Sequence, residues 1–582
     1  MKKLIISKNN KSKNSKENLY LNYQSYFDFY EDHEDFDKNE NIVPHYSNHS
    51  KDVNFHLLEC EKLYNKILPD LLREFNNFHK KNYSIKSGHL ILGFWLDRFI
   101  RISYDRYNLL KSAFKNFQID EIEIFNTKNY NFSSTITQDI TKLSSQKNWN
   151  YALNSELLNY FELHKTKYAD NEEKIDTINY FPIITKNFLV IELYKKICGI
   201  FKFFINENTS VITKTYFPFF LEKILEIKLN QLPFVWDFSF SIKNKVDIEK
   251  RSKISLKKND AINEKNLENF IRLLIPKCLP ISILEGFSDL VKLIEKYPKN
   301  PKMIISSVEF DTNDLFKIYC SEKIELGTKI ISGQHGNGSF LVPESKYLPD
   351  LKFSDYYYTW GNKKVKNFIP FCNTNVVNKK NVGNKGKKLV IFTTSYGWNY
   401  TLYDRQEISF QNINLIQELV SSLPQNIKSS LILKKHNAKT LKCHNSLEMR
   451  YDNLNITKLI NKTFSEALNH SKLNLFLYNS TGVMDCLALN KPVIFYIKNL
   501  SNLYSKDFYD KLTILKDANI FFDDISELKK HIINIWDNVD DWWENKLTQE
   551  KIKNYNKNFN EKYTKSKFSD FYRFLKNLDH NN

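Results

Sequence analysis

The chain has 582 residues, of which 42% are hydrophobic, 15% aromatic and 26% charged. This composition supplies apolar material for substantial cores and excludes a wholly disordered chain. With only 13 glycines and 14 prolines, the chain is neither collagen-like nor a Pro/Gly-rich low-complexity sequence. The formal net charge of +18 favours anionic partners such as nucleic acid, an anionic lipid surface or a phosphorylated substrate. Because no zinc-finger spacing, RNA-binding signature or basic zipper is present, we expect no nucleic-acid partner.

Cysteine usage and hydropathy predict a cytoplasmic protein. The 7 cysteines are odd in number and form no C-x-x-C motif, which suits a reducing compartment. The first residues lack the long apolar stretch of a signal peptide, and no stretch approaches the roughly 18 apolar residues of a membrane span. We therefore expect a cytoplasmic location. We also expect at most peripheral binding to the anionic inner face of the cytoplasmic membrane, through basic and aromatic surface patches.

The first half of the chain is expected to be mainly helical. Residues 1–50 are polar and rich in Asn, Lys and carboxylates, and we expect no strand among them. Apolar residues at helical spacing predict helices over 51–118, and 147–230 is also expected to be mostly helical. The stretch 241–266 is charged and is expected to be a loop.

From residue 267 onward, short β-branched runs alternate with helical periodicity, which is the βαβ pattern of parallel, doubly wound sheets. The expected strands are 303–307, 329–332, 388–394, 430–434, 473–478, 492–497 and 519–522. The fold class is therefore α/β with two Rossmann-like lobes and helical additions on the N-terminal lobe. The expected division is a polar N-terminal segment (1–50), an N-terminal lobe (51–370), a linker (371–387), a C-terminal lobe (388–540) and terminal helices packing back on the N-terminal lobe (541–582).

The first candidate site is the glycine-rich run GQHGNG at 333–338, which directly follows the expected strand at 329–332. Glycine lets the backbone approach a ligand closely, and parallel sheets bind ligands at the carboxyl edge of their strands. The run therefore places His335 where a neutral imidazole accepts a proton, and Gly336 where the backbone meets a bound ligand. The alternative for His335 is a structural role.

Carboxylates follow the neighbouring expected strand at 303–307. Glu309 and Asp311 lie in the run SSVEFDTND, directly after that strand. Either carboxylate at this edge is suited to orient an imidazole or to act as a second base. A solvated loop is the alternative for both.

Two further motifs follow strands of the C-terminal lobe. The run SLILKKHNAK at 430–439 ends a strand with Lys434 and His436, whose charges suit a nucleotide diphosphate; surface lysines capping a strand are the alternative. The run LFLYNSTGVMDCLALNKPVIFYI at 475–497 predicts a strand, a turn at 479–482 and a helix. Backbone N–H groups and the hydroxyls at this helix start are suited to bind an anion, with an ordinary N-cap as the alternative. The turn residues are Asn479, Ser480, Thr481 and Gly482. A D-x-D motif at Asp35 and Asp37 follows no expected strand and is interpreted as a solvated segment, so we expect neither a metal nor another cofactor.

GQHGNGSF at 333–340, LKKHNAK at 433–439 and YNSTGVMDCLALNKPVIFYI at 478–497 together resemble glycosyltransferases with two Rossmann-like lobes, the arrangement called GT-B. With LILGFWLDRFIRISYDRY at 90–107, the chain more narrowly resembles a family of transferases encoded in bacterial O-antigen and surface-polysaccharide loci. The resemblance covers about two thirds of the chain, from near residue 55. That family opens with a strand, which we do not expect here. The family's sequence around the position of His436 also differs from the LKKHNAK run of this chain.

The resemblance implies a metal-independent enzyme that moves a sugar from a nucleotide-activated donor to a lipid-linked or saccharide acceptor of O-antigen type. His335 would be the base, oriented by Glu309 or Asp311. The donor phosphates would lie against Gly336, Lys434, His436 and the turn 479–482. The runs HG at 335–336 and NKPVIFY at 490–496 equally resemble teichoic-acid polymerases, so transfer of a polyol phosphate is an alternative. A module that holds nucleotide or polysaccharide without turnover is another.

Overall fold

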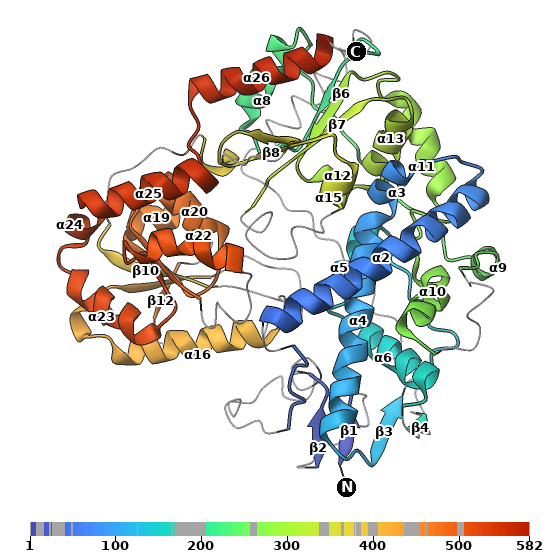
Figure 1. The fold of residues 1–582 in the computed structure, drawn as a ribbon, viewed down its shortest axis with the longest axis horizontal. Helices are drawn as coiled ribbons and strands as arrows, with labels where there is room; N and C mark the ends of the chain where they lie inside the picture. The colour runs from blue at the N-terminus through green and yellow to red at the C-terminus, as the bar shows by residue number, and fades with distance from the viewer. Residues whose placement is uncertain are drawn as a thin grey trace.

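The computed structural model describes residues 2–6, 17–22, 25, 41–47, 50–124, 126–163, 167–168, 205–256, 265–336, 349–361, 366–377, 379, 386–393, 406–435, 454, 456–459, 462–497 and 506–580. This part of the chain is a mixed α/β structure containing three parallel sheets (Figure 1). Their strand orders are β2-β1-β3-β4, β5-β6-β7-β8-β9 and β12-β11-β10-β13-β14-β15. Across these ranges, none of the helices combines the length and the apolar character that a bilayer crossing requires.

The strands are β1 (Lys3–Ile5), β2 (Asn18–Tyr20), β3 (Glu121–Ile124), β4 (Lys167–Tyr168), β5 (Val211–Ile212), β6 (Met303–Ser306), β7 (Lys329–Gly333), β8 (Tyr356–Thr359), β9 (Phe368–Pro370), β10 (Lys388–Phe392), β11 (Leu431–Lys434), β12 (Thr457–Lys458), β13 (Ser471–Phe476), β14 (Val493–Tyr496) and β15 (Phe521–Phe522). The longer helices are α2 (Ser50–His79), α3 (Ile85–Ile91), α4 (Gly93–Asn116), α6 (Lys147–Phe161), α8 (Phe219–Lys228), α10 (Leu267–Cys278), α11 (Phe287–Leu293), α13 (Asp314–Glu325), α16 (Gln406–Ser422), α19 (Phe464–His470), α20 (Thr481–Ala488), α22 (Lys506–Lys516), α23 (Ile525–Ile535), α25 (Lys546–Phe559) and α26 (Lys565–His580). Short helical segments are α5 (Ile140–Leu143), α9 (Ile248–Ser252), α12 (Glu309–Thr312), α15 (Asp350–Phe353), α17 (Gln425–Lys428) and α24 (Val539–Glu544).

The N-terminal residues form strands, so the expectation of no strand in 1–50 was wrong. β1 pairs in parallel with β2 and with β3, aligning Leu4 with Leu19 and with Ile122. All three side chains are buried. Each of these strands has only three or four residues, and β3 comes from a part of the sequence distant from β1 and β2. A three-residue apolar run between polar stretches is too short to show the alternation from which a strand is predicted.

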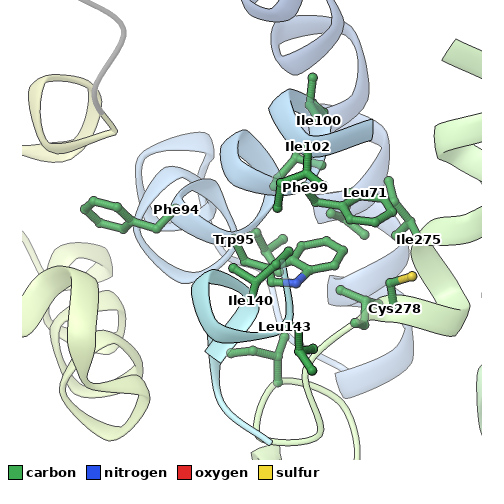
Figure 2. Close-up of a cluster of buried hydrophobic side chains, with 14 of the residues drawn as sticks. Leu71, Phe94, Trp95, Phe99, Ile100, Ile102, Ile140, Leu143, Ile275 and Cys278 are labelled. Carbon is green, nitrogen blue, oxygen red and sulfur yellow. The ribbon is translucent and has the colours of Figure 1, made fainter. Parts of the chain in front are cut away.

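Helices α2, α3 and α4 occupy the region where helices were expected, and a continuous apolar core holds them together. Trp95 of α4 is at the centre of the cluster in Figure 2 and stacks on Phe99, with ring centroids 5.1 Å apart. Leu71 of α2, Ile140 and Leu143 of α5, and Ile275 and Cys278 of α10 surround it. This core joins helices that are distant in sequence into one support beside the second sheet.

The second sheet contains the expected strands β6 and β7, and three strands that we did not predict. β5 lies inside a region expected to be helical, which corrects that expectation; its two residues are too few to interrupt a helical pattern. α13 belongs to the core on one face of the sheet, while α8 and α26 belong to the core on the other. Phe571 and Leu575 of α26 are fully buried there with Ile305 of β6.

The third sheet contains all five strands expected between 388 and 522. Its order reverses at β10: β11 and β12 lie to one side, and β13, β14 and β15 to the other. This is the strand order of a doubly wound, Rossmann-like sheet. Separate apolar cores cover the two faces, one including residues of α20, α22 and α25 and the other residues of α16 and α23.

The chain passes between the second and third sheets twice. Phe371 and Cys372 are buried in a core of the second sheet, and Val376 is buried in a core of the third. At the C-terminal end, α25 packs on the third sheet and α26 on the second (Figure 1). Between these two crossings, the backbone N–H of Asn373 donates to Glu561 O at 2.8 Å, so the two passages are hydrogen-bonded to each other.

Candidate functional site

The end of β7 is shaped by a close approach between Gly333 and Tyr358 of β8. A Cβ atom at residue 333 would lie 1.9 Å from Tyr358 Cζ, so only glycine fits. The Tyr358 hydroxyl donates to Thr215 O at 2.8 Å and is also hydrogen-bonded to Ser307 Oγ. Tyr358 thus joins the ends of β5, β6 and β7, two residues before His335 in the chain.

Gln334 fixes the backbone on both sides of His335. Its side chain is buried, with Oε1 accepting from the Trp360 N–H at 2.9 Å and Nε2 donating to Gly336 O at 3.1 Å. Its own backbone N–H donates to Tyr358 O at 2.9 Å. A buried amide with both ends hydrogen-bonded holds one loop conformation, which makes Gln334 a positioning residue for the imidazole.

The loop after β5 presents an aromatic ring to His335. Lys214 and Tyr216 in this loop have φ angles of +47° and +62°. Non-glycine residues in this left-handed region carry strain that surrounding contacts must sustain, and such residues cluster at functional sites. The Tyr216 ring stacks on His335, with ring centroids 5.8 Å apart and an interplanar angle of 21°.

Asp311 is the carboxylate that acts on His335. Arg98 of α4 binds it through two hydrogen bonds of 2.7 Å each. Although burial alone would raise the pKa of Asp311, the Arg98 charge and hydrogen bonds hold it below its usual value. His335 reaches the surface, yet the surrounding protein desolvates its charged form and lowers its pKa, while the Asp311 charge opposes that shift. His335 is therefore biased toward the neutral form that can accept a proton.

Glu309 begins α12 at the same sheet edge. Burial raises its pKa, and the nearby charge of Lys214 opposes this. Of the two expected acids, Asp311 is thus the one whose charge acts on His335, whereas Glu309 faces the β5 loop.

Asp350 is a further acid at this edge, which the sequence did not single out. It accepts a hydrogen bond from Ser332 Oγ at 2.8 Å. Burial raises its pKa to about 7, and the charge of Asp311 adds to the shift. Two neighbouring carboxyl groups with pKa values pushed apart are typical of sites that transfer protons.

The turn 479–482 lies at the carboxyl end of β13, next to β10, where the strand order reverses. Tyr478 Oη donates to Thr393 O at 3.1 Å, which joins the ends of these two strands. Ser480 is the N-cap of α20, and its hydroxyl accepts from the Gly482 N–H at 3.1 Å. A Cβ on Gly482 would lie 2.8 Å from the Phe476 ring, so this glycine lets the helix pack closely on its strand. The crevice at such a reversal is where open α/β sheets bind ligands.

Lys434 ends β11 on the far side of β10. Its side chain is largely buried, and Nζ donates to Lys435 O at 2.6 Å. Burial lowers the pKa of this lysine. His436, the other candidate in this run, lies outside the described residues.

The two groups of candidate residues meet at one contact. A Cβ on Gly336 would lie 3.4 Å from Thr481 Oγ1, so the loop after β7 touches the N-terminus of α20. The described residues thus bring together His335, Gly336, Asp311 and Arg98 at the second sheet and Ser480 and Thr481 at the third. No group of three His, Cys, Asp or Glu side chains within the described ranges is arranged to hold a metal ion.

Sequence reasoning missed Arg98, Lys214, Tyr216, Gln334 and Asp350. Gln334 lies inside the run GQHGNG and was a signal that we did not use. Lys214 and Tyr216 follow an unpredicted strand, and Arg98 comes from a helix more than 200 residues before the acid it binds. These placements depend on tertiary structure that no local pattern shows.

The comparisons with known proteins give a class and a family. A family model described as "LIC12162 family transferase" matches residues 2–567. The chain therefore belongs to the LIC12162 family of transferases. Among solved structures, a point mutant of the O-GlcNAc transferase of Thermobaculum terrenum aligns with 9% sequence identity over 91% of this chain and 98% of that one, at a TM-score of 0.32. No curated protein matches.

Proposed function

We propose that this transferase is a glycosyltransferase of GT-B type that moves a sugar from a nucleotide-activated donor to a hydroxyl of a surface-polysaccharide acceptor. The observation that carries the proposal is the contact between Gly336 and Thr481. It joins a histidine-bearing strand end to a capped helix start located at the order reversal of a Rossmann-like sheet.

The donor nucleotide binds at the turn 479–482 in this proposal. The N-terminal end of a helix favours an anion through its backbone N–H groups and its dipole, and the hydroxyls of Ser480 and Thr481 add donors. Lys434 and His436 supply positive charge from the neighbouring strand end. Their role is to stabilise the charge that develops on the departing phosphate, without a metal.

His335 accepts the proton of the acceptor hydroxyl while that oxygen attacks the anomeric carbon of the donor. The bond from this carbon to the phosphate oxygen breaks, and the nucleotide leaves with the electron pair. The depressed pKa of His335 leaves the imidazole neutral near pH 7, as a base requires. Asp311, fixed by Arg98, stabilises the imidazolium that forms.

The test is a binding and turnover panel. Isothermal titration with nucleotides and nucleotide sugars identifies the donor, and mass spectrometry of copurified nucleotide provides an independent assignment. Turnover of the bound donor, before and after treatment with EDTA, then separates a metal-independent transferase from a binding module. Nucleotide binding without any transfer or hydrolysis contradicts the proposal, as does loss of turnover with EDTA.

A further inference from the structure

Helix α8 buries the charged side chains of Lys223 and Glu226 while it leaves three apolar side chains exposed. Glu226 accepts from the Phe234 N–H at 2.8 Å and from Lys223 Nζ at 2.7 Å, and both charged side chains are buried. Glu222 accepts from Thr215 Oγ1 at 2.7 Å. Burying charge is unfavourable unless it is paired, so these hydrogen bonds are what permit Lys223 and Glu226 to lie inside.

The outward face of α8 carries Phe220, Ile224 and Ile227, whose exposed fractions are 74%, 45% and 56%. Positions i, i+4 and i+7 lie on one side of a helix, so the three side chains form a single apolar strip. The opposite side, which carries Leu221 and Leu225, is buried against the second sheet.

Positive charge borders this strip. The exposed residues of 211–235 include Lys214 and Lys228 but no carboxylate. Lys228 Nζ lies 5.4 Å from the centre of the Tyr572 ring on α26, the helix beside α8 in Figure 1. On the neighbouring α26, the exposed Asp570 is paired with Arg573 at 3.3 Å. An apolar strip whose own segment exposes lysines and no carboxylate complements an anionic surface.

The strip leads to the candidate site. Tyr216, which stacks on His335, is 45% exposed and lies one helical turn before Phe220 in the sequence. The short loop that carries Tyr216 thus connects the candidate site directly to the start of α8.

We propose that the outer face of α8, formed by Phe220, Ile224 and Ile227, docks on an anionic lipid bilayer. Apolar side chains enter the boundary between headgroups and acyl chains, while Lys214 and Lys228 bind the headgroups. A second copy of the chain is a poorer occupant, because two such faces would bring lysines against lysines. Docking would bring His335 close to the membrane surface, where a lipid-linked acceptor presents its hydroxyl; this last point rests on the proposed glycosyltransfer.

The test measures binding of the full chain to vesicles of mixed phosphatidylglycerol and phosphatidylcholine by cosedimentation. The variant F220S/I224S/I227S removes the strip. The control I248S/L326S removes two other exposed apolar side chains, Ile248 on α9 and Leu326 after α13, whose exposed fractions are 81% and 64%. Circular dichroism and thermal melting establish that both variants fold.

We expect the wild type and the control to bind, and the F220S/I224S/I227S variant to lose about tenfold or more in partitioning. Binding should also weaken with salt and with pure phosphatidylcholine. Equal binding of all three proteins overturns the proposal, and so does a wild type that fails to bind. Concentration-dependent association that only F220S/I224S/I227S abolishes, without vesicle binding, assigns the face to a second copy instead. His335→Ala should bind vesicles like the wild type, so a failure of the docking surface is distinguishable from a failure of the catalytic assignment.

Discussion

Gly336 and Thr481 lie against each other, with 3.4 Å between the Cβ position of the glycine and the threonine Oγ1. One residue follows a strand of the second sheet, and the other begins a helix of the third. The two residues are far apart in sequence, yet their contact lies between the two motifs that sequence analysis selected independently. A ligand bound at α20 would therefore reach the loop that carries His335.

Donor affinity should depend on the hydroxyls of the α20 turn. We expect Thr481→Val to weaken donor binding by about 0.5–1.5 kcal/mol, the usual net value of one hydrogen bond. Ser480→Ala should also weaken donor binding, and it should lower the free energy of unfolding by about 1 kcal/mol because the N-cap is lost. Titration calorimetry and chemical denaturation separate the two effects. Unchanged donor affinity in both variants would remove the turn from the donor site.

The position of the acid limb of the pH–rate profile should depend on the Arg98–Asp311 pair, because the pair influences the pKa of His335. Arg98→Met removes the guanidinium charge that opposes Asp311 at this site, so as long as the carboxyl of Asp311 stays ionised it should raise the pKa of His335 further. The neutral base would then be lost at a higher pH, and the acid limb of kcat/KM should move upward by a fraction of a pH unit to about one unit. Arg73→Met is the control, since Arg73 is exposed and pairs with Asp70 far from this edge. Asp311→Asn should move the limb downward, because the charge that raises the pKa of His335 is lost. An unmoved acid limb in both Arg98→Met and Asp311→Asn would show that Asp311 does not act on the base.

The Gly333–Tyr358 contact predicts a large loss of stability. Gly333→Ala places a methyl group inside the tyrosine ring, so we expect a loss of about 3 kcal/mol or more in the free energy of unfolding. Gly327→Ala, with open space around the Cβ position and a φ of +88°, should cost only about 1 kcal/mol. Urea denaturation compares the two. If Gly333→Ala is no worse than Gly327→Ala, the close approach beneath His335 is not present in solution.

Acid should destabilise the fold through buried histidines. Burial lowers the pKa of His79, His89 and His531 to about 4 each. These folded-state values lie below the unfolded value of about 6.5, so the unfolded chain binds protons first as the pH falls. The contribution of these neutral histidines to the free energy of unfolding is complete above about pH 6.5. It is lost progressively as the pH falls toward 4.

His79→Gln isolates one of these contributions, because glutamine retains a donor for Ile283 O, which His79 Nε2 contacts at 3.0 Å. The drop in melting temperature between about pH 7 and pH 5 should be smaller in this variant, by the equivalent of roughly 2 kcal/mol in the free energy of unfolding. An identical drop in His79→Gln and the wild type would mean that folding does not lower the pKa of His79.

The sequence predicted the third sheet more completely than the first two. Its predicted strands are apolar runs followed by amphipathic helices, so periodicity identified five of them. β1, β2 and β5 have two or three residues each, and β1 and β5 pair with strands far away in sequence. His335 and the turn 479–482 were recognisable because glycine and hydroxyl residues follow strands there. Arg98 was not, because its pairing with Asp311 exists only once α4 packs beside the second sheet.

The central claim, that His335 is the base of a nucleotide-dependent transfer, is tested most directly by measuring turnover and donor affinity together in His335→Ala. Removing a general base typically lowers the rate by about 10²–10⁴-fold. We therefore predict a fall of that order in kcat with donor affinity close to the wild-type value. His470→Ala, at an exposed position at the end of α19, is the matched control and should retain both. Near-normal turnover in His335→Ala would contradict the account.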